Sequence, residues 1–214
     1  MLYKPYFKVL TVPLQPTKED AMIISLSGPS GIGKGFIQER LLQAYPFMKE
    51  LVWLTTRTLR PNEGKGNRIS VSESEFDILA KTEKLVLAQS LFGHRYGLRR
   101  EDLLPGPCVN LTEINPENLK LALEINPEII AIGLMTFDFS LLHRRLSAVR
   151  KTESIPEIEK RVATAKVEVE TILRNKSLYA AVIEVKESSE TSIVSQVIAI
   201  LNPYLTGKEN GHAP

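Results

Sequence analysis

Short apolar runs alternate with longer amphipathic stretches along most of this chain. Runs typical of buried strands occupy residues 22–26, 51–54, 108–111, 129–134 and 181–185. Apolar residues at three- to four-residue spacing predict helices over 36–45, 116–124, 138–149, 156–174 and 191–201. Strands that alternate with helices predict an α/β fold with a mostly parallel sheet and helices on both of its faces.

One stretch breaks this alternation. Residues 56–105 are richer in glycine and charge and contain only short strand-like pieces, which predicts a small lobe inserted into a core formed by residues 21–55 and 106–202. Residues 1–20 mix aromatic residues, lysines and prolines and are interpreted as an N-terminal arm. Residues 203–214 are polar and predict a flexible tail.

Composition narrows the class of protein. The chain has 214 residues, of which 43% are hydrophobic and 24% charged, as in ordinary soluble domains. A net charge of +2 gives no indication of a nucleic-acid partner, and no apolar run reaches the roughly 18 residues of a membrane helix. The single cysteine, Cys108, excludes an intramolecular disulfide and is expected to be a small core residue of its strand. With no secretion-signal pattern at the N-terminus, these features predict a cytoplasmic protein.

The segment Gly28-Pro29-Ser30-Gly31-Ile32-Gly33-Lys34 follows a predicted strand and opens a predicted helix. In that context a glycine-rich loop directs backbone N–H groups at phosphates, and the lysine neutralises the outer phosphates during transfer. A glycine-rich turn without a ligand is the simpler alternative. The predicted nucleotide-binding residues are Gly28, Ser30, Gly31, Ile32, Gly33, Lys34, Gly35 and Phe36.

The residue after the lysine departs from the usual pattern. A serine or threonine normally follows the lysine and binds Mg²⁺ through its hydroxyl, whereas this chain has Gly35 and then Phe36. We therefore expect Mg²⁺ to accompany ATP through the nucleotide phosphates and water, without an assigned protein ligand.

Together with the segment Thr55-Thr56-Arg57-Thr58-Leu59-Arg60-Pro61, this loop resembles the guanylate kinase family. The resemblance continues through residues 72–76, 93–97 and 142–146. It implies a P-loop kinase fold of three layers with an inserted acceptor-binding lobe and a helical lid near 145–161. The implied activity is ATP-dependent phosphoryl transfer to a phosphorylated small molecule, with no nucleic-acid or membrane partner.

The resemblance also implies roles for individual residues. Arg57, Arg60 and Tyr96 match residues that hold the phosphate of the acceptor, and a guanidinium suits such bidentate contacts. Lys34 and the lid arginines Arg145, Arg150 and Arg161 match groups that stabilise the migrating phosphoryl group. The alternative is that these arginines lie on solvated helix faces.

The base-reading positions differ from the family pattern. Ile69, Leu87 and Leu98 stand where the family has polar residues, and Glu113 is the remaining carboxylate of an acidic strand end. Apolar side chains supply no hydrogen bonds to a base edge.

Three functions therefore stay open: a kinase for a nucleoside monophosphate such as GMP, a kinase for a non-nucleotide phosphate ester such as ribose 1,5-bisphosphate, or a catalytically degenerate binding module. The sequence does not indicate an oligomeric state.

Overall fold

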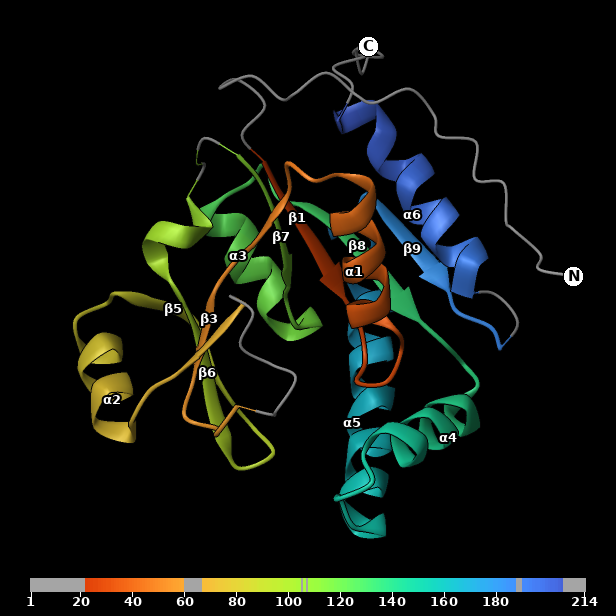
Figure 1. Cartoon of the computed structure of the whole chain (residues 1–214), viewed down its shortest axis with the longest axis horizontal. Helices are drawn as coiled ribbons and strands as arrows, with labels where there is room; N and C mark the ends of the chain where they lie inside the picture. The colour runs from red at the N-terminus through yellow and green to blue at the C-terminus, as the bar shows by residue number, and fades with distance from the viewer. Residues whose placement is uncertain (1–21, 60–66, 105, 107, 188–189, 206–214) are drawn as a thin grey trace, which may run out of the picture.

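The computed structural model describes residues 22–59, 67–104, 106, 108–187 and 190–205. Its central sheet has five strands in the order β2-β7-β1-β8-β9, and every neighbouring pair is parallel. The strands are β1 (Met22–Ser27), β2 (Lys49–Glu50), β7 (Val109–Glu113), β8 (Ile130–Met135) and β9 (Ala181–Glu184). The predicted α/β fold with a mostly parallel sheet is confirmed (Figure 1).

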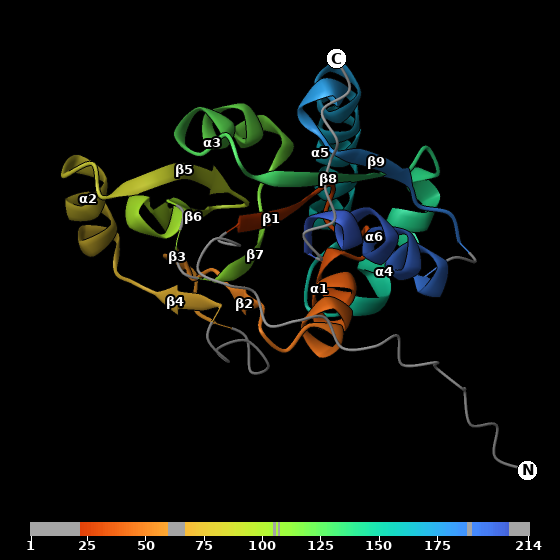
Figure 2. The ribbon, with the colours of Figure 1, turned by 90° about the horizontal axis from the view of Figure 1, so that it is seen from above.

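Helices cover both faces of this sheet (Figure 2). Helices α1 (Lys34–Ala44) and α6 (Glu190–Leu205) lie on one face, and α3 (Leu119–Ile125) and α5 (Ile155–Arg174) lie on the other. Successive side chains of a strand point to opposite faces of the sheet, which explains the two layers. Ile23 of β1 packs in the core cluster that contains residues of α3, and its neighbour Ile24 packs in the cluster that contains residues of α1 and α6. Helix α4 (Phe139–Val149) joins β8 to α5.

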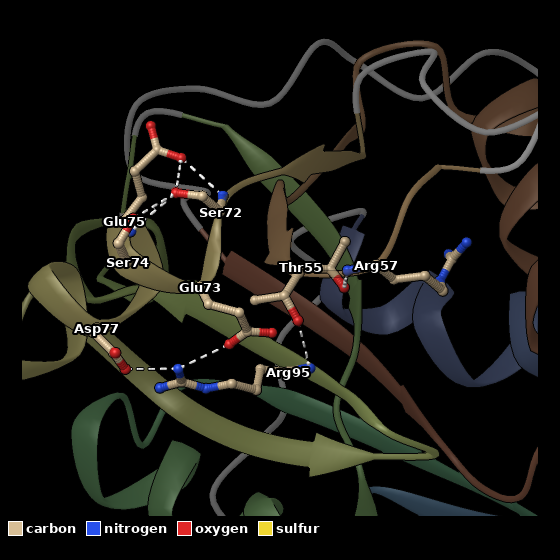
Figure 3. Close-up of polar contacts among 9 residues, drawn as sticks. Thr55, Arg57, Ser72, Glu73, Ser74, Glu75, Asp77 and Arg95 are labelled. Atoms are coloured by element: carbon tan, nitrogen blue, oxygen red, sulfur yellow. Dashed lines mark hydrogen bonds and ion pairs between the residues drawn. The ribbon is translucent and has the colours of Figure 1, made fainter.

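A second sheet, in the order β4-β3-β6-β5, forms the lobe beside the core. Its strands are β3 (Trp53–Thr55), β4 (Arg68–Ser70), β5 (Leu85–Leu91) and β6 (His94–Arg99). Helix α2 (Glu73–Lys81) buries Phe76 against Leu54 and Leu85, and a capping box between Ser72 and Glu75 fixes its first turn (Figure 3).

The strand predicted over 51–54 is confirmed only in part, because Trp53 and Leu54 lie in a strand whereas Leu51 and Val52 do not. Lys49–Glu50 pairs with β7 in the central sheet, whereas Trp53–Thr55 pairs with β6 and belongs to the lobe. The chain crosses between the sheets at Leu51, whose N–H donates to the carbonyl of Leu111. Leu51 and Trp53 are both buried in the cluster under α3. The apolar run is therefore a buried crossing between two sheets, which hydrophobicity alone does not distinguish from one strand.

Other elements differ mainly at their ends. The helix expected from residue 116 begins as the 3₁₀ turn η3 (Pro116–Asn118), and further 3₁₀ turns are η2 (Arg100–Leu103) and η4 (Lys176–Leu178). Cys108 is half-buried and precedes β7, so its expected place within the strand is wrong.

Helix α6 continues through Pro203 to Leu205, beyond the start expected for the tail. Burial of Val197 and Leu201 against the core offsets the backbone hydrogen bond that proline removes. Residues 1–20 and 206–214 lie outside the described residues, so the predictions of an arm and of a flexible tail stay predictions.

Candidate active site

The glycine-rich loop lies at the carboxyl end of β1, as the sequence predicts. Gly28 passes so close to β8 that a Cβ atom there would meet the carbonyl oxygen of Leu134 at 2.3 Å. Gly33 has a φ of 111° and caps α1 in the left-handed conformation, which glycine adopts without steric cost. The loop therefore curls back over the helix N-terminus, where N–H groups and the helix dipole favour an anion.

Lys34 occupies the mouth of this loop. Its ammonium donates to the carbonyls of Gly28 at 2.7 Å and Pro29 at 3.2 Å, and lies 3.8 Å from Oε2 of Glu113. Glu113 reaches this place because β1 and β7 pair in parallel, with Leu26 opposite Glu113. The carboxylate of Glu113, expected from the sequence, thus lies with Lys34 at the carboxyl ends of the strands.

A single cavity of about 540 Å³ joins the loop to the lobe. Gly28, Ser30 and Lys34 line one part of it, and Arg57 and Tyr96 line another. Side chains of α5 and of the preceding turn line a third part: Arg150, Thr152, Glu153, Glu157, Lys160, Arg161, Thr164 and Glu168. Residues predicted separately for a donor, an acceptor and a lid therefore face one space.

Arg57 is positioned by the end of β3. Its N–H donates to Oγ1 of Thr55 at 3.2 Å, and its Nη1 donates to the carbonyl of Thr58 at 2.9 Å. Figure 3 shows its side chain pointing away from α2. Tyr96 is opposite Thr55 across the β3–β6 pair. Arg60, the third predicted acceptor residue, lies outside the described residues.

Arg95 stabilises the lobe itself. Its Nη1 lies 3.1 Å from Glu73 and 2.6 Å from Asp77 on α2, and its guanidinium covers the Phe76 ring at 4.2 Å (Figure 3). Hydrogen bonds from Thr56 and Arg95 lower the pKa of Glu73. These contacts join α2 to the sheet that carries Tyr96.

The three predicted lid arginines have different surroundings. Arg145 donates from Nη1 to the carbonyl of Ile32 at 3.1 Å. It therefore contacts the glycine-rich loop, but it is not one of the residues that line the cavity. Arg161 makes a bidentate pair with Glu153, at 2.6 and 2.9 Å, and Arg150 lies 3.6 Å from the same carboxylate. Arg150 and Arg161 are mostly buried, at 21% and 12% side-chain exposure, so neither lies on a solvated helix face.

Arg161 also contacts the lobe. Its guanidinium lies 3.8 Å from the ring centroid of Phe92, at the tip of the β5–β6 hairpin. This cation–π contact joins α5 to the lobe across the cavity.

Gly35 and Phe36 do not line the cavity. Phe36 is half-buried beneath the guanidinium of Arg40, 5.0 Å from its ring. Gly35 is exposed, and a Cβ atom there would meet no atom within 4 Å. Space for a side chain therefore exists at position 35 although the hydroxyl of the usual pattern is absent.

Sequence reasoning assigned Arg161 to the site but missed the other polar residues on the same face of α5. Glu157, Lys160, Thr164 and Glu168 recur with Arg161 at three- to four-residue spacing, which indicates one helix face and could have been found in the sequence.

Glu168 is the most buried of these residues, at 8% exposure. Burial raises the pKa of Glu168 to about 7, although the positive charge of Lys34 opposes this shift.

The three positions at which the family pattern predicts contacts with the base lie outside the cavity. Leu87 and Leu98 are buried in the core and Ile69 is 42% exposed, and none of the three lines the cavity. The cavity surface near the lobe instead includes five residues that sequence reasoning did not assign to a site: Trp53, Arg68, Gln89, His94 and Asn115. They come from five different segments, namely β3, β4, β5, β6 and the turn after β7, so no local motif connects them.

The described residues contain no group of three or more histidine, cysteine, aspartate or glutamate side chains that could hold a metal ion. Among the same residues, no helix combines the length and apolar character that crossing a membrane requires.

Comparison with known proteins adds independent information. A guanylate kinase of Streptomyces coelicolor is 35% identical over 164 residues, which cover 74% of this chain and 82% of that protein. A guanylate kinase of Nostoc is 33% identical over 162 residues, covering 72% and 80%. No family model matches the chain.

Among solved structures, guanylate kinase from Anaplasma phagocytophilum aligns with a TM-score of 0.65 at 20% identity, over 92% of this chain and 90% of that one. A gluconokinase from Sinorhizobium meliloti aligns at 0.50, with 14% identity and coverage of 87% and 95%. These similarities confirm the predicted P-loop kinase fold.

The buried carboxyl group of Glu168 predicts a pH dependence of stability. Its folded pKa of about 7 lies above its ordinary value, so the folded state binds the proton more tightly and stability falls as pH rises from about 4.5 through 7. Replacement Glu168→Gln should remove this loss. In urea unfolding at pH 5, 6, 7 and 8, the variant should gain stability relative to the parent protein as pH rises.

Glu170→Gln provides the control, because it removes an exposed carboxylate from the same helix. A stability difference between Glu168→Gln and the parent that stays constant over this pH range would contradict the buried, protonated state of Glu168.

Proposed function

Because this chain belongs to the guanylate kinase family, we propose that its phosphotransferase activity carries the γ-phosphoryl group of ATP to GMP. Membership rests on identities above 30% over more than two thirds of the chain. The observation that carries the proposal is the continuous cavity between the glycine-rich loop, the lobe and α5. Phosphoryl transfer needs donor and acceptor phosphates in line and shielded from water, and a cavity shared by the two sites supports such an arrangement.

The loop and Lys34 would hold the donor phosphates. Backbone N–H groups at the start of α1 point toward an anion, and the ammonium already lies at the mouth of the loop. In this structure Lys34 donates to loop carbonyls. Phosphate oxygens would replace these weaker acceptors as charge-assisted partners. Arg145 would keep the loop in place through the carbonyl of Ile32.

Arg57 and Tyr96 would hold the phosphate of the acceptor, together with Arg60 by family resemblance. Arg150 and Arg161 line the same cavity, and Glu153 orients their guanidinium groups. When the phosphates enter, these arginines would exchange part of their contact with Glu153 for the migrating phosphoryl group. The protein thus supplies alignment and positive charge and forms no covalent intermediate.

Mg²⁺ would enter with ATP and neutralise phosphate charge. The cavity fits this mode of binding, because the carboxylate of Glu113 lines it beside Lys34 and Mg²⁺ is commonly held by one or two carboxylates, phosphates and waters. Gly35 supplies no hydroxyl ligand. A cytoplasmic location remains a prediction.

A second candidate acceptor is a sugar bisphosphate such as ribose 1,5-bisphosphate. Arg68 and His94 line the cavity in addition to Arg57 and Tyr96, and Arg68 adds a guanidinium that a second phosphate would pair with. Leu87 and Leu98 offer no hydrogen bond to a base, because both are in the core. GMP ranks first because the relatives at more than 30% identity are guanylate kinases.

A coupled ADP-release assay with ATP, Mg²⁺ and parallel acceptors tests the proposal. We expect turnover with GMP to exceed turnover with ribose 1,5-bisphosphate, and Lys34→Ala to abolish it without lowering the melting temperature. Lys120→Ala, an exposed lysine on α3, is the matched control and should retain activity. Preference for the sugar bisphosphate would support the second candidate. Silence with every acceptor despite stabilisation by ATP would identify a degenerate binding module.

Position 35 offers a test of the metal requirement. Gly35 lies within the first turn of α1 with space around it, so Gly35→Ala and Gly35→Ser should each stabilise the fold by about 0.5 to 1 kcal/mol. Only the serine adds a hydroxyl where Mg²⁺-binding loops carry one. We expect Gly35→Ser alone to lower the Mg²⁺ concentration for half-maximal turnover. Equal Mg²⁺ requirements in the two variants would show that position 35 does not face the metal.

A further inference from the structure

Strand β5 contains an irregularity beside the acceptor part of the cavity. Its pairing with β6 shifts register between Val86 and Gln89, and Leu87 has a φ of 53°, a left-handed value that is rare for leucine. Such a bulge places an extra residue in one strand and re-aims the side chains that follow it. Leu87 enters the core, and Gln89 lines the cavity directly opposite Tyr96 of β6.

Two asparagines hold the amide of Gln89. Asn115 donates from Nδ2 to Oε1 of Gln89 at 2.9 Å, and Asn118 donates from Nδ2 to the same oxygen at 3.0 Å. Asn118 also donates to the carbonyl of Leu87 at 3.4 Å, which the bulge leaves available. A carbonyl oxygen only accepts, so Asn118 must present its nitrogen on this side, and Gln89 must present its oxygen.

This arrangement leaves one amide group of Gln89 for a ligand. With Oε1 bound by both asparagines, Nε2 is the other end of the amide, and no hydrogen-bond partner for it occurs among the residues described here. Gln89 lines the cavity together with Asn115, whose Oδ1 is an acceptor because its Nδ2 is used as a donor. Nε2 of Gln89 is therefore a fixed donor on the acceptor side of the active site.

We propose that Gln89 is a specificity-determining residue whose Nε2 donates to the carbonyl oxygen of a 6-oxopurine acceptor. This inference rests on the proposed nucleoside monophosphate kinase function. A 6-oxopurine offers an acceptor oxygen beside a ring N–H donor, which complements Nε2 of Gln89 and Oδ1 of Asn115. A 6-aminopurine presents a donor where the oxygen would lie. The 6-amino group and Nε2 of Gln89 would then be two donors facing each other in a partly buried site. A site built for one pattern of donors and acceptors discriminates strongly against a ligand with the opposite pattern.

The ordinary structural role of Gln89 would be to tie β5 to η3. The variant Gln89→Glu separates the two roles. One carboxylate oxygen still accepts from both asparagines, whereas the second oxygen stands in place of Nε2 and turns the donor into an acceptor. A purely structural tie would therefore survive the substitution, whereas base discrimination would not.

The test compares kcat/KM for GMP, IMP and AMP in the parent protein and in Gln89→Glu. We expect the parent to prefer both 6-oxopurines over AMP. The variant should reduce the ratio of GMP to AMP by about tenfold or more, with an unchanged melting temperature and an unchanged KM for ATP. Gln196→Glu, the same substitution at an exposed site on α6, should leave the ratio unaltered.

Two different failures can be recognised. If the parent protein is active with GMP but Gln89→Glu keeps the parental ratio of GMP to AMP, the role of Gln89 is overturned and the proposed function stands. If the parent phosphorylates none of the three nucleotides, the proposed function is overturned, and the inference about Gln89 is overturned with it.

Discussion

The close approach of the Gly28 backbone to the carbonyl of Leu134 fixes where the phosphate-binding loop lies. Strand β1 is the middle strand of the parallel sheet, so the loop that leaves its carboxyl end must pass between the ends of β7 and β8. A side chain at residue 28 would force the loop away from β8. The parallel register of β1 and β7 brings Glu113 beside Lys34, and residues of the loop and of α5 line the same cavity. The contact of Lys34 with the carbonyl of Gly28 therefore depends on how closely β1 and β8 approach each other at this glycine.

Charge is the second constraint on this site. Cationic side chains outnumber carboxylates around the cavity, and several of the cations are already paired with acids that also line it. Glu153 holds Arg150 and Arg161, and Glu113 lies beside Lys34. Such pairing reduces the cost of burying the cations before substrate binds. Phosphates can then compete for guanidinium and ammonium groups that are already oriented.

The sequence predicted the elements that local patterns determine. The loop from Gly28 to Lys34, the helix after it and the parallel sheet follow from glycine spacing and apolar periodicity. The sequence did not predict that residues 51–54 cross between two sheets, because burial makes such a crossing as apolar as a strand. It also missed Gln89, which depends on a bulge, and Glu168, which depends on the face of α5 that meets the loop. Those features arise from tertiary packing that joins distant segments.

Binding of a bisubstrate analogue measures directly whether donor and acceptor phosphates occupy one cavity. A compound that joins adenosine and guanosine through five phosphates would span Lys34 and Arg57 in a single molecule. By calorimetric titration we expect it to bind at least an order of magnitude more tightly than ATP or GMP alone, because linkage removes the entropy cost of a second binding event. We also expect Lys34→Ala and Arg57→Ala each to abolish this advantage. An affinity no higher than that of ATP, unchanged by Arg57→Ala, would contradict a shared cavity for the two phosphates.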